Sequence, residues 1–207
     1  MKVVICVNDK GDRWNNYLNV PKPLIPIDGE SLIHRTVRLL KQFGISKILI
    51  PSTDPQFAVE GVTQFNPKRH TWLIDQNPVE CLNEPVTFVM GDVYWTESAL
   101  KKVLETTPEK YAFFHATNPI NNWKDEVAVK VVDYEGFAAG IKEYRKDLFK
   151  GLCKDRGTYE LRMKLLGLPY QNYNSNDELV VYLPPDETCD FDCKEDYDKW
   201  IAKFRSN

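Results

Sequence analysis

The chain has 207 residues, of which 43% are hydrophobic and 12% aromatic, so it is long enough to bury a sizeable core. Its formal net charge of -3 excludes the global basic field expected of a nucleic-acid binder, although a local basic groove stays open. Length and composition favour one α/β domain that spans residues 1–207.

The cysteine content and the first residues indicate where the protein works. Five cysteines are an odd number and form no CxxC pair, which argues against a zinc site or a disulfide framework and for reduced thiols. The opening MKVVICVND returns to charged residues too early for a signal peptide or a membrane span. We therefore expect a soluble, cytoplasmic protein.

The first half of the chain alternates strand-like and helix-like segments. Buried strands are predicted at residues 2–7, 47–50, 71–74, 86–90 and 111–116. Amphipathic helices are predicted at 31–44 and 96–107, with Ser31 and Thr96 as their N-caps. This alternation predicts an α/β fold with a mostly parallel, doubly wound sheet.

The second half is less regular. Its alternating segment at 126–133 is consistent with an antiparallel strand. The other expected elements are helices at 136–150, 157–167 and 195–204 and a strand at 178–183. The longest loops are expected at 117–125 and 168–177, and loops at the edge of such a sheet are where substrates are held.

The loop VNDKGDRW follows the first predicted strand and carries candidates for a phosphate site. Ligands of open α/β sheets lie beyond the carboxyl ends of the strands. Gly11 would let backbone amides approach a phosphate, Arg13 would contact two phosphate oxygens, and Lys22 would add a point charge. Asn8 and Asp12 complete the substrate-binding candidates of this loop. For this loop alone, a solvated surface loop is the alternative interpretation.

Three segments in sequence order carry a more specific signal. The first, GDRWNNYLNVPKPLIPIDGESLIHRTVRLLKQFGISKILI, combines the end of a GxGTR-type loop with a PKPL segment, a glycine and a helix. The second, FVMGDVYW, places an aspartate after a buried strand, and the third, FDCKEDYDKW, is similar to a closing iDTpeDy pattern. Together these segments resemble sugar-nucleotide pyrophosphorylases and related nucleotidyltransferases.

The resemblance implies a GT-A-like nucleotide-binding fold and a transfer reaction in which NTP and a sugar 1-phosphate give NDP-sugar and pyrophosphate. It implies that Asp92 and Asp192 hold Mg²⁺ (or Mn²⁺), with Gly91 beside them in the substrate site. Arg13 would stabilise the departing pyrophosphate and Lys22 the phosphorus under attack. The expected partners are a nucleotide or nucleotide-sugar and a sugar phosphate or acceptor hydroxyl.

The opening loop also departs from the family, because Asn8 and Asp9 stand where small residues and a first glycine are usual. A carboxylate about 4 Å from a phosphate charge costs on the order of 4 kcal/mol at an effective dielectric of 20. A glycosyltransferase that uses an NDP-sugar is therefore the first alternative. Its metal would be held by Asp92 or by the D-x-D pair of Asp190 and Asp192, and its acceptors include a hydroxylated DNA base.

Other features leave further interpretations open. Basic patches at 67–70 and 142–154, the second with Tyr144 and Phe149, would suit a nucleic-acid backbone, and solvated surface is the alternative. His115, at the end of a predicted strand, is a candidate pocket residue. A non-catalytic nucleotide-binding module is the second alternative function, and the retained cations and aspartates argue against it.

Overall fold

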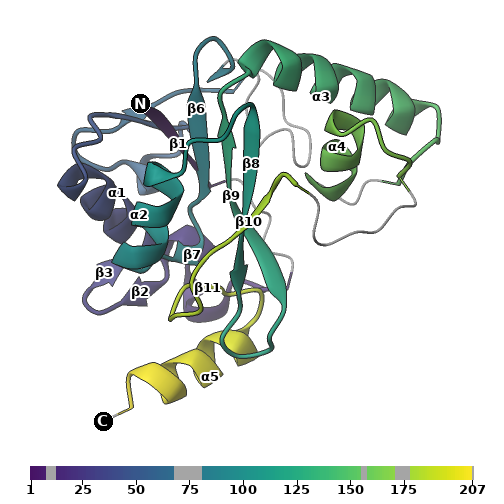
Figure 1. Ribbon diagram of the computed structural model, residues 1–207. Helices are drawn as coiled ribbons and strands as arrows, with labels where there is room; N and C mark the ends of the chain where they lie inside the picture. The colour runs from purple at the N-terminus through teal and green to yellow at the C-terminus, as the bar shows by residue number, and fades with distance from the viewer. Residues whose placement is uncertain (8–12, 68–80, 155–157, 171–177, 207) are drawn as a thin grey trace.

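The computed structural model describes residues 1–7, 13–67, 81–154, 158–170 and 178–206. In this part of the chain a seven-stranded sheet has the order β10-β8-β9-β6-β1-β4-β5 (Figure 1). Its strands are β1 (Lys2–Cys6), β4 (Lys47–Ile50), β5 (Thr63–Gln64), β6 (Val86–Met90), β8 (Tyr111–Thr117), β9 (Lys124–Val131) and β10 (Val180–Tyr182). Neighbouring strands pair in parallel except at β9, which is antiparallel to both β6 and β8. The predicted mostly parallel α/β sheet is confirmed.

Helices cover both sides of this sheet. They are α1 (Leu32–Gln42), α2 (Glu97–Glu105), α3 (Tyr134–Phe149), α4 (Thr158–Leu165) and α5 (Lys194–Phe204). Helices α1 and α2 contact each other on one side, α3 and α4 contact each other on the other, and α5 lies beyond one end of the sheet (Figure 1). Both predicted N-caps are present: Ser31 Oγ accepts a hydrogen bond from the His34 amide, and Thr96 Oγ1 from the Ala99 amide.

Two short antiparallel pairs were not predicted from the sequence. One joins β2 (Pro26–Ile27) to β3 (Glu30–Ser31), and the other joins β7 (Val93–Tyr94) to β11 (Cys189–Asp190). The second pair matters for function because it carries the C-terminal segment to the end of β6. The strand expected at 71–74 lies outside the described residues.

Two buried clusters stabilise this arrangement. The larger one contains the inward side chains of the central sheet and of the helices that cover it. The smaller one lies at the end of the sheet and consists of Trp14, Ile25, Ile27, Leu32, Tyr94, Cys189, Phe191 and Trp200. The smaller cluster joins segments from the beginning, middle and end of the chain, so its apolar burial fixes how these segments meet.

None of the described helices is long and apolar enough to cross a membrane.

Candidate functional site

The site forms where β1 and β6 end next to each other. Their parallel register pairs Cys6 with Met90, and the Gly91 amide donates a hydrogen bond to the Cys6 carbonyl oxygen at 2.8 Å. A Cβ atom on residue 91 would lie 2.7 Å from that oxygen. Gly91 therefore allows the two backbones to approach at the point where Asp92 leaves the sheet.

The β7–β11 pair brings the C-terminal aspartates to Asp92. Asp190 is paired with Val93, the residue that follows Asp92. Phe191 is completely buried in the smaller cluster, where its ring centroid lies 5.5 Å from that of Trp200. Because neighbouring residues of an extended chain point to opposite sides, burial of Phe191 turns Asp190 and Asp192 toward the site.

Lys22 joins the three carboxylates. Its Nζ lies 3.1 Å from Asp92 Oδ2, 3.4 Å from Asp190 Oδ1 and 3.8 Å from Asp192 Oδ1. Only 4% of the lysine side chain is exposed, so these charges interact with little screening by solvent. Pro21 and Pro23 flank Lys22 and restrict its backbone.

Arg13 approaches the same site from the opening loop. Its Nη2 lies 2.6 Å from Asp192 Oδ1, and 65% of the arginine side chain is exposed. The next residue, Trp14, is buried, donates from Nε1 to the Val20 carbonyl oxygen and lies 6.0 Å from the Tyr197 ring. Burial of Trp14 therefore anchors the backbone next to Arg13, while the guanidinium of Arg13 faces solvent.

The segment after Trp14 has an uncommon backbone. Asn15, Asn16, Leu18 and Asn19 all have φ between 47° and 62°, in the left-handed region. Asparagine tolerates this region better than other non-glycine residues, whereas Leu18 is strained there. The Asn-rich sequence of this segment thus permits a tight path between Arg13 and Lys22.

A fourth carboxylate, Asp125, was not identified from the sequence. It lies at the start of β9, where Asn118 Nδ2 donates to its Oδ2 at 3.2 Å. The same Nδ2 is 3.4 Å from the Asp190 carbonyl oxygen, so buried Asn118 connects Asp125 to the strand that carries Asp190. The available signal was that both residues fall in the predicted loop at 117–125, which follows the strand predicted at 111–116.

The site holds more carboxyl groups than cations. Burial raises the pKa of Asp190 well above its usual range, and Asp92 and Asp192 raise it further against the opposing effect of Lys22. Burial also raises the pKa of Asp125 to about 6; the Asn118 hydrogen bond opposes this shift, and the charge of Asp192 adds to it. Four carboxylates therefore face two cations, an arrangement that favours binding of a further cation.

The donor chemistry fits a hard divalent cation. Mg²⁺ prefers oxygen ligands and is usually held by one or two carboxylates, with substrate phosphates and water as the other ligands. Among the described residues, no three His, Cys, Asp or Glu side chains form a ready metal cluster. Asp92 and Asp192, which converge on one ammonium group, could supply the protein share of such a coordination shell.

The predicted substrate-binding residues are Asn8, Gly11, Asp12 and Gly91. Asn8, Gly11 and Asp12 lie outside the described residues. Gly91 is buried and has a packing role beneath the site; its substrate contact stays a prediction.

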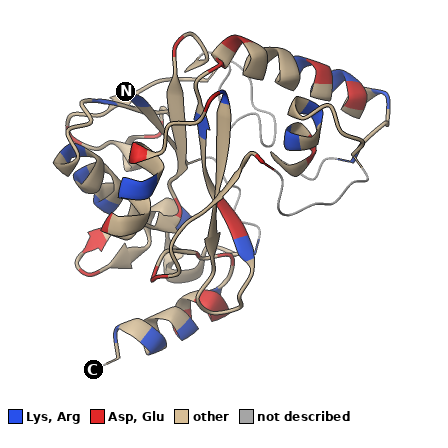
Figure 2. Cartoon of the chain, in the orientation of Figure 1, with Lys and Arg blue, Asp and Glu red and all other residues tan. Residues whose placement is uncertain are grey.

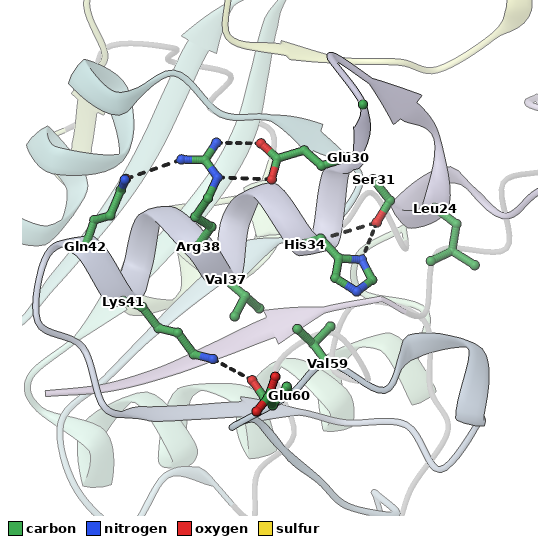
Figure 3. Close-up of a pocket in the computed structure, with 11 residues that line it drawn as sticks. Leu24, Glu30, Ser31, His34, Val37, Arg38, Lys41, Gln42, Val59 and Glu60 are labelled. Atoms are coloured by element: carbon green, nitrogen blue, oxygen red, sulfur yellow. Dashed lines mark hydrogen bonds and ion pairs between the residues drawn. The ribbon is translucent and has the colours of Figure 1, made fainter.

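A groove on the outer side of α1 is separate from these carboxylates. It has a volume of about 1090 Å³, and its walls include Leu24, His34, Val37 and Val59 (Figure 3). Arg38 pairs with Glu30 at its rim, and none of the site carboxylates lines it.

The proposed nucleic-acid contact of Tyr144 is wrong. Its side chain is buried, with its ring 6.4 Å from that of Tyr170, because it belongs to the core-facing side of α3. Phe149 is 95% exposed, but positive and negative residues alternate along α3 (Figure 2). Mixed charge of this kind does not form a continuous phosphate-binding stripe. Most of the patch at 67–70 lies outside the described residues.

No family model and no curated protein matches the sequence. Solved structures match it in fold. The CTP:phosphocholine cytidylyltransferase of Streptococcus pneumoniae is 18% identical with a TM-score of 0.60, and the match covers 98% of each chain. The inositol-1-phosphate CTP transferase of T. maritima is 12% identical with a TM-score of 0.64, covering 100% of this chain and 96% of its own.

A third match is the UDP-glucose pyrophosphorylase of Acinetobacter baumanii. It is 10% identical with a TM-score of 0.60, covering 98% of this chain and 92% of its own. Identities this low establish the fold alone. The chain has the fold of these nucleotidyltransferases, which confirms the resemblance drawn from its sequence at the level of fold.

Proposed function

We propose that the protein is a nucleotidyltransferase that joins the nucleotide of an NTP to a sugar 1-phosphate and releases pyrophosphate. The observation that carries this proposal is the convergence of Asp92 and Asp192 on Lys22 at the carboxyl ends of β1 and β6. Ligands of open α/β sheets bind at this edge. The fold shared with known nucleotidyltransferases supports the same conclusion.

Arg13 and Lys22 would act on the phosphates. In the structure both cations pair with site carboxylates. Phosphate oxygens of a bound nucleotide would take over these cations, Lys22 at the phosphorus under attack and Arg13 at the departing pyrophosphate. Such transfers are catalysed mainly by positioning and by stabilisation of charge, which is what fixed cations provide.

When Lys22 and Arg13 bind phosphate oxygens, the carboxylates of Asp92 and Asp192 would also become free to bind a metal. Mg²⁺ bound there would neutralise the phosphates and polarise the phosphoryl oxygens. We therefore expect the metal and the nucleotide each to raise the affinity of the protein for the other. The phosphates would draw Lys22 and Arg13 away from the carboxylates that bind the metal, and the metal would draw those carboxylates away from the cations that bind the phosphates.

A glycosyltransferase using an NDP-sugar is the second candidate function. Asp190 and Asp192 both lie against Lys22, and this D-x-D pair suits a metal that holds the diphosphate of an NDP-sugar. The acceptor would be a hydroxyl, including one on a DNA base.

Calorimetry of the full chain with NTPs and NDP-sugars, each with and without Mg²⁺, separates the two candidates. Strong Mg²⁺-dependent NTP binding and release of pyrophosphate on adding a sugar 1-phosphate support nucleotidyl transfer. Tight NDP-sugar binding, without pyrophosphate from any NTP, would reject it in favour of glycosyl transfer.

The substitution Asp9→Gly tests the role of the opening loop. It should improve NTP binding if the Asp9 carboxylate repels phosphate, and it should weaken NTP binding if Asp9 recruits the metal.

A further inference from the structure

Arg205, the residue directly after α5, binds three separate segments of the chain at once. Its Nε donates to Asp28 Oδ1 at 2.7 Å, and its Nη2 donates to Asp28 Oδ2 at 2.9 Å. The same Nη2 lies 2.6 Å from the Tyr94 hydroxyl and 3.0 Å from Glu187 Oε2. The Tyr94 hydroxyl in turn donates to Asp28 Oδ2 at 3.1 Å. We call these four side chains the Arg205 clasp.

The first partner, Asp28, is held in a tight hairpin turn. Asp28 and Gly29 connect β2 to β3, and both have positive φ, 54° and 82°. Compact two-residue hairpin turns require such angles, and aspartate tolerates them better than most residues. The hairpin continues beyond its strands, because the Leu32 amide donates to the Ile25 carbonyl oxygen at 3.1 Å. Lys22 lies shortly before β2, so the clasp holds the segment that presents Lys22 to the site.

The other two partners belong to the β7–β11 pair. Tyr94 ends β7, which begins directly after Asp92, and it is opposite Cys189 in the ladder. Glu187 lies just before β11, which contains Cys189 and Asp190. One guanidinium group is therefore bound to both chain segments of the pair that brings Asp92 and Asp190 together.

The clasp lies on the side of this pair that faces away from the site carboxylates. Tyr94 and Cys189 belong to the smaller buried cluster, where the Tyr94 ring lies 4.6 Å from the Trp200 ring. Neighbouring residues of a strand point to opposite faces, and Asp190 points to Lys22. Arg205 therefore acts on the site through the backbone segments that it holds, and not by contact with a substrate.

The chemistry of the clasp favours a fixed geometry. A planar guanidinium fits a carboxylate with two parallel hydrogen bonds, and bonds between charged groups are stronger than neutral ones. Only 24% of the Arg205 side chain is exposed, and its Cζ lies 4.6 Å from the centre of the Trp200 ring. The hydrogen bond from Arg205 lowers the pKa of Asp28, so this carboxyl is ionised at neutral pH.

We propose that Arg205 is a positioning residue: by joining the β2–β3 hairpin to the β7–β11 pair, it sets the placement of Lys22 relative to the site aspartates. Its effect on turnover rests on the proposed nucleotidyl transfer. Catalysis by fixed charges depends on their placement, and an error of about 1 Å can lower a rate about 100-fold.

Steady-state kinetics of the full chain with NTP, sugar 1-phosphate and Mg²⁺ test this role. Arg205→Gln should lower kcat about tenfold and change the KM for NTP less than about threefold, because the site residues are all present and only their placement changes. Arg205→Lys keeps the charge but loses the planar fork, so it should recover only part of kcat. Tyr94→Phe is the milder variant, since it removes only the hydroxyl and keeps the ring in the cluster; its loss of kcat should be smaller.

Arg38→Gln is the matched control. Arg38 forms a similar fork with Glu30, with its Nε 3.0 Å from Glu30 Oε2, but these two residues lie in the continuous β3–α1 segment. The control should keep wild-type kcat. Circular dichroism and urea denaturation establish that each variant is folded under the assay conditions. A folded Arg205→Gln that is less stable than the wild type but has the same kcat would show that Arg205 is merely structural, and would overturn the inference.

A thermodynamic cycle that requires no activity provides a second test. Asp92 and Arg205 share no ionic partner in the described part of the chain. If they were independent, the effects of Asp92→Asn and Arg205→Gln on the unfolding equilibrium constant would multiply. The clasp predicts that the double variant departs from this product by at least about fivefold, whereas Asp92→Asn with Arg38→Gln should follow it. A multiplicative result for both pairs would overturn the inference.

The two tests also separate this inference from the proposed function. If no NTP yields pyrophosphate with any sugar 1-phosphate, the proposed function fails, and the denaturation cycle alone decides whether Arg205 positions the site. If pyrophosphate is released at the wild-type rate by Arg205→Gln, nucleotidyl transfer stands and the positioning role of Arg205 is rejected.

Discussion

The ammonium group of Lys22 lies 3.1 Å from the Asp92 carboxylate, and both side chains are almost completely buried. Asp190 and Asp192 contact the same Nζ atom at longer distances. Arg13 is bound to Asp192 as well, but it projects into solvent. The two candidate phosphate ligands therefore differ in how strongly the folded chain depends on them.

Alanine substitution should expose this difference. Lys22→Ala and Arg13→Ala should each lower kcat/KM by about 100-fold, equivalent to about 3 kcal/mol of transition-state stabilisation. Lys22→Ala should in addition lower the free energy of unfolding by about 3 kcal/mol, because it leaves buried carboxylates without their cation. Arg13→Ala should leave stability nearly unchanged, as is usual for an exposed ion pair.

Steady-state kinetics and urea denaturation measure the two effects separately. Wild-type kcat/KM in both variants would reject this site as the active site. Equal loss of stability in the two variants would reject the contrast between the buried and the exposed cation.

The metal ligands are tested by Asp92→Asn and Asp192→Asn. Each substitution keeps side-chain volume but removes a charge, so turnover should be abolished while the circular dichroism spectrum is retained. The stabilisation that Mn²⁺ adds to the nucleotide-bound protein in a thermal shift should also disappear. Asp198→Asn, an exposed aspartate of α5 paired with Lys194, is the control and should retain both properties. Metal-dependent stabilisation that survives in both site variants would remove Asp92 and Asp192 from the metal site.

The sequence predicted most of the central sheet because its signals are local. Strands at 47–50 and 86–90 have the observed bounds, since each is a continuous apolar run, and Ser31 and Thr96 cap their helices as expected. The β7–β11 pair could not be predicted, because each strand has two residues and the pairing joins positions almost a hundred residues apart.

Only part of the site could be predicted from the sequence, because only some of its residues lie in local motifs. Asp92 and Lys22 lie in recognisable motifs, and Asp192 lies in the closing motif. Because side chains alternate along an extended chain, Asp190 faces the same side as Asp192 and also lies at the site. Asp125 was assigned to a loop, whereas β9 begins at Lys124 and makes it a strand residue. Its proximity to the site depends on the side-chain bond from Asn118, which no sequence periodicity encodes.

Gly91 offers a test of packing beneath the site. Gly91→Ala would place a methyl group 2.7 Å from the Cys6 carbonyl oxygen, a backbone atom that cannot move without shifting β1. The free energy of unfolding should fall by about 2 kcal/mol. Gly140→Ala in α3 is the matched control, because its new methyl group meets the flexible end of Leu165 and alanine favours a helix. A loss in Gly140→Ala as large as that in Gly91→Ala would contradict the steric explanation.

The raised pKa of Asp125 predicts a specific dependence of stability on pH. Its pKa is about 6 in the folded chain against an ordinary value of 3.8, so the folded state binds more protons between these values. The contribution of Asp125 to stability is therefore fully present below about pH 4 and is lost as the pH rises through 6. At pH 7.5 the mostly buried carboxylate is ionised, and its ionisation should cost about 3 kcal/mol of stability. The charges of Asp192 and Asp196 add to this cost, and Arg13 opposes it. Asp125→Asn removes this charge and keeps an oxygen that accepts the bond from Asn118.

Urea denaturation of Asp125→Asn in metal-free buffer between pH 4 and 7.5 measures this effect. The variant should be more stable than the wild type at pH 7.5, and the difference should shrink below pH 6 and vanish near pH 4. Asp198→Asn supplies the opposite case, because hydrogen bonds from Lys194 and Tyr17 lower the pKa of Asp198 and its removal should bring no gain at pH 7.5. A stability difference between wild type and Asp125→Asn that is constant across this range would show that the Asp125 carboxylate does not titrate with a raised pKa. Mg²⁺ with nucleotide should reduce the advantage of Asp125→Asn at pH 7.5, since a bound divalent cation would offset the charges of Asp192 and Asp196, which add to the effect of burial on the pKa of Asp125.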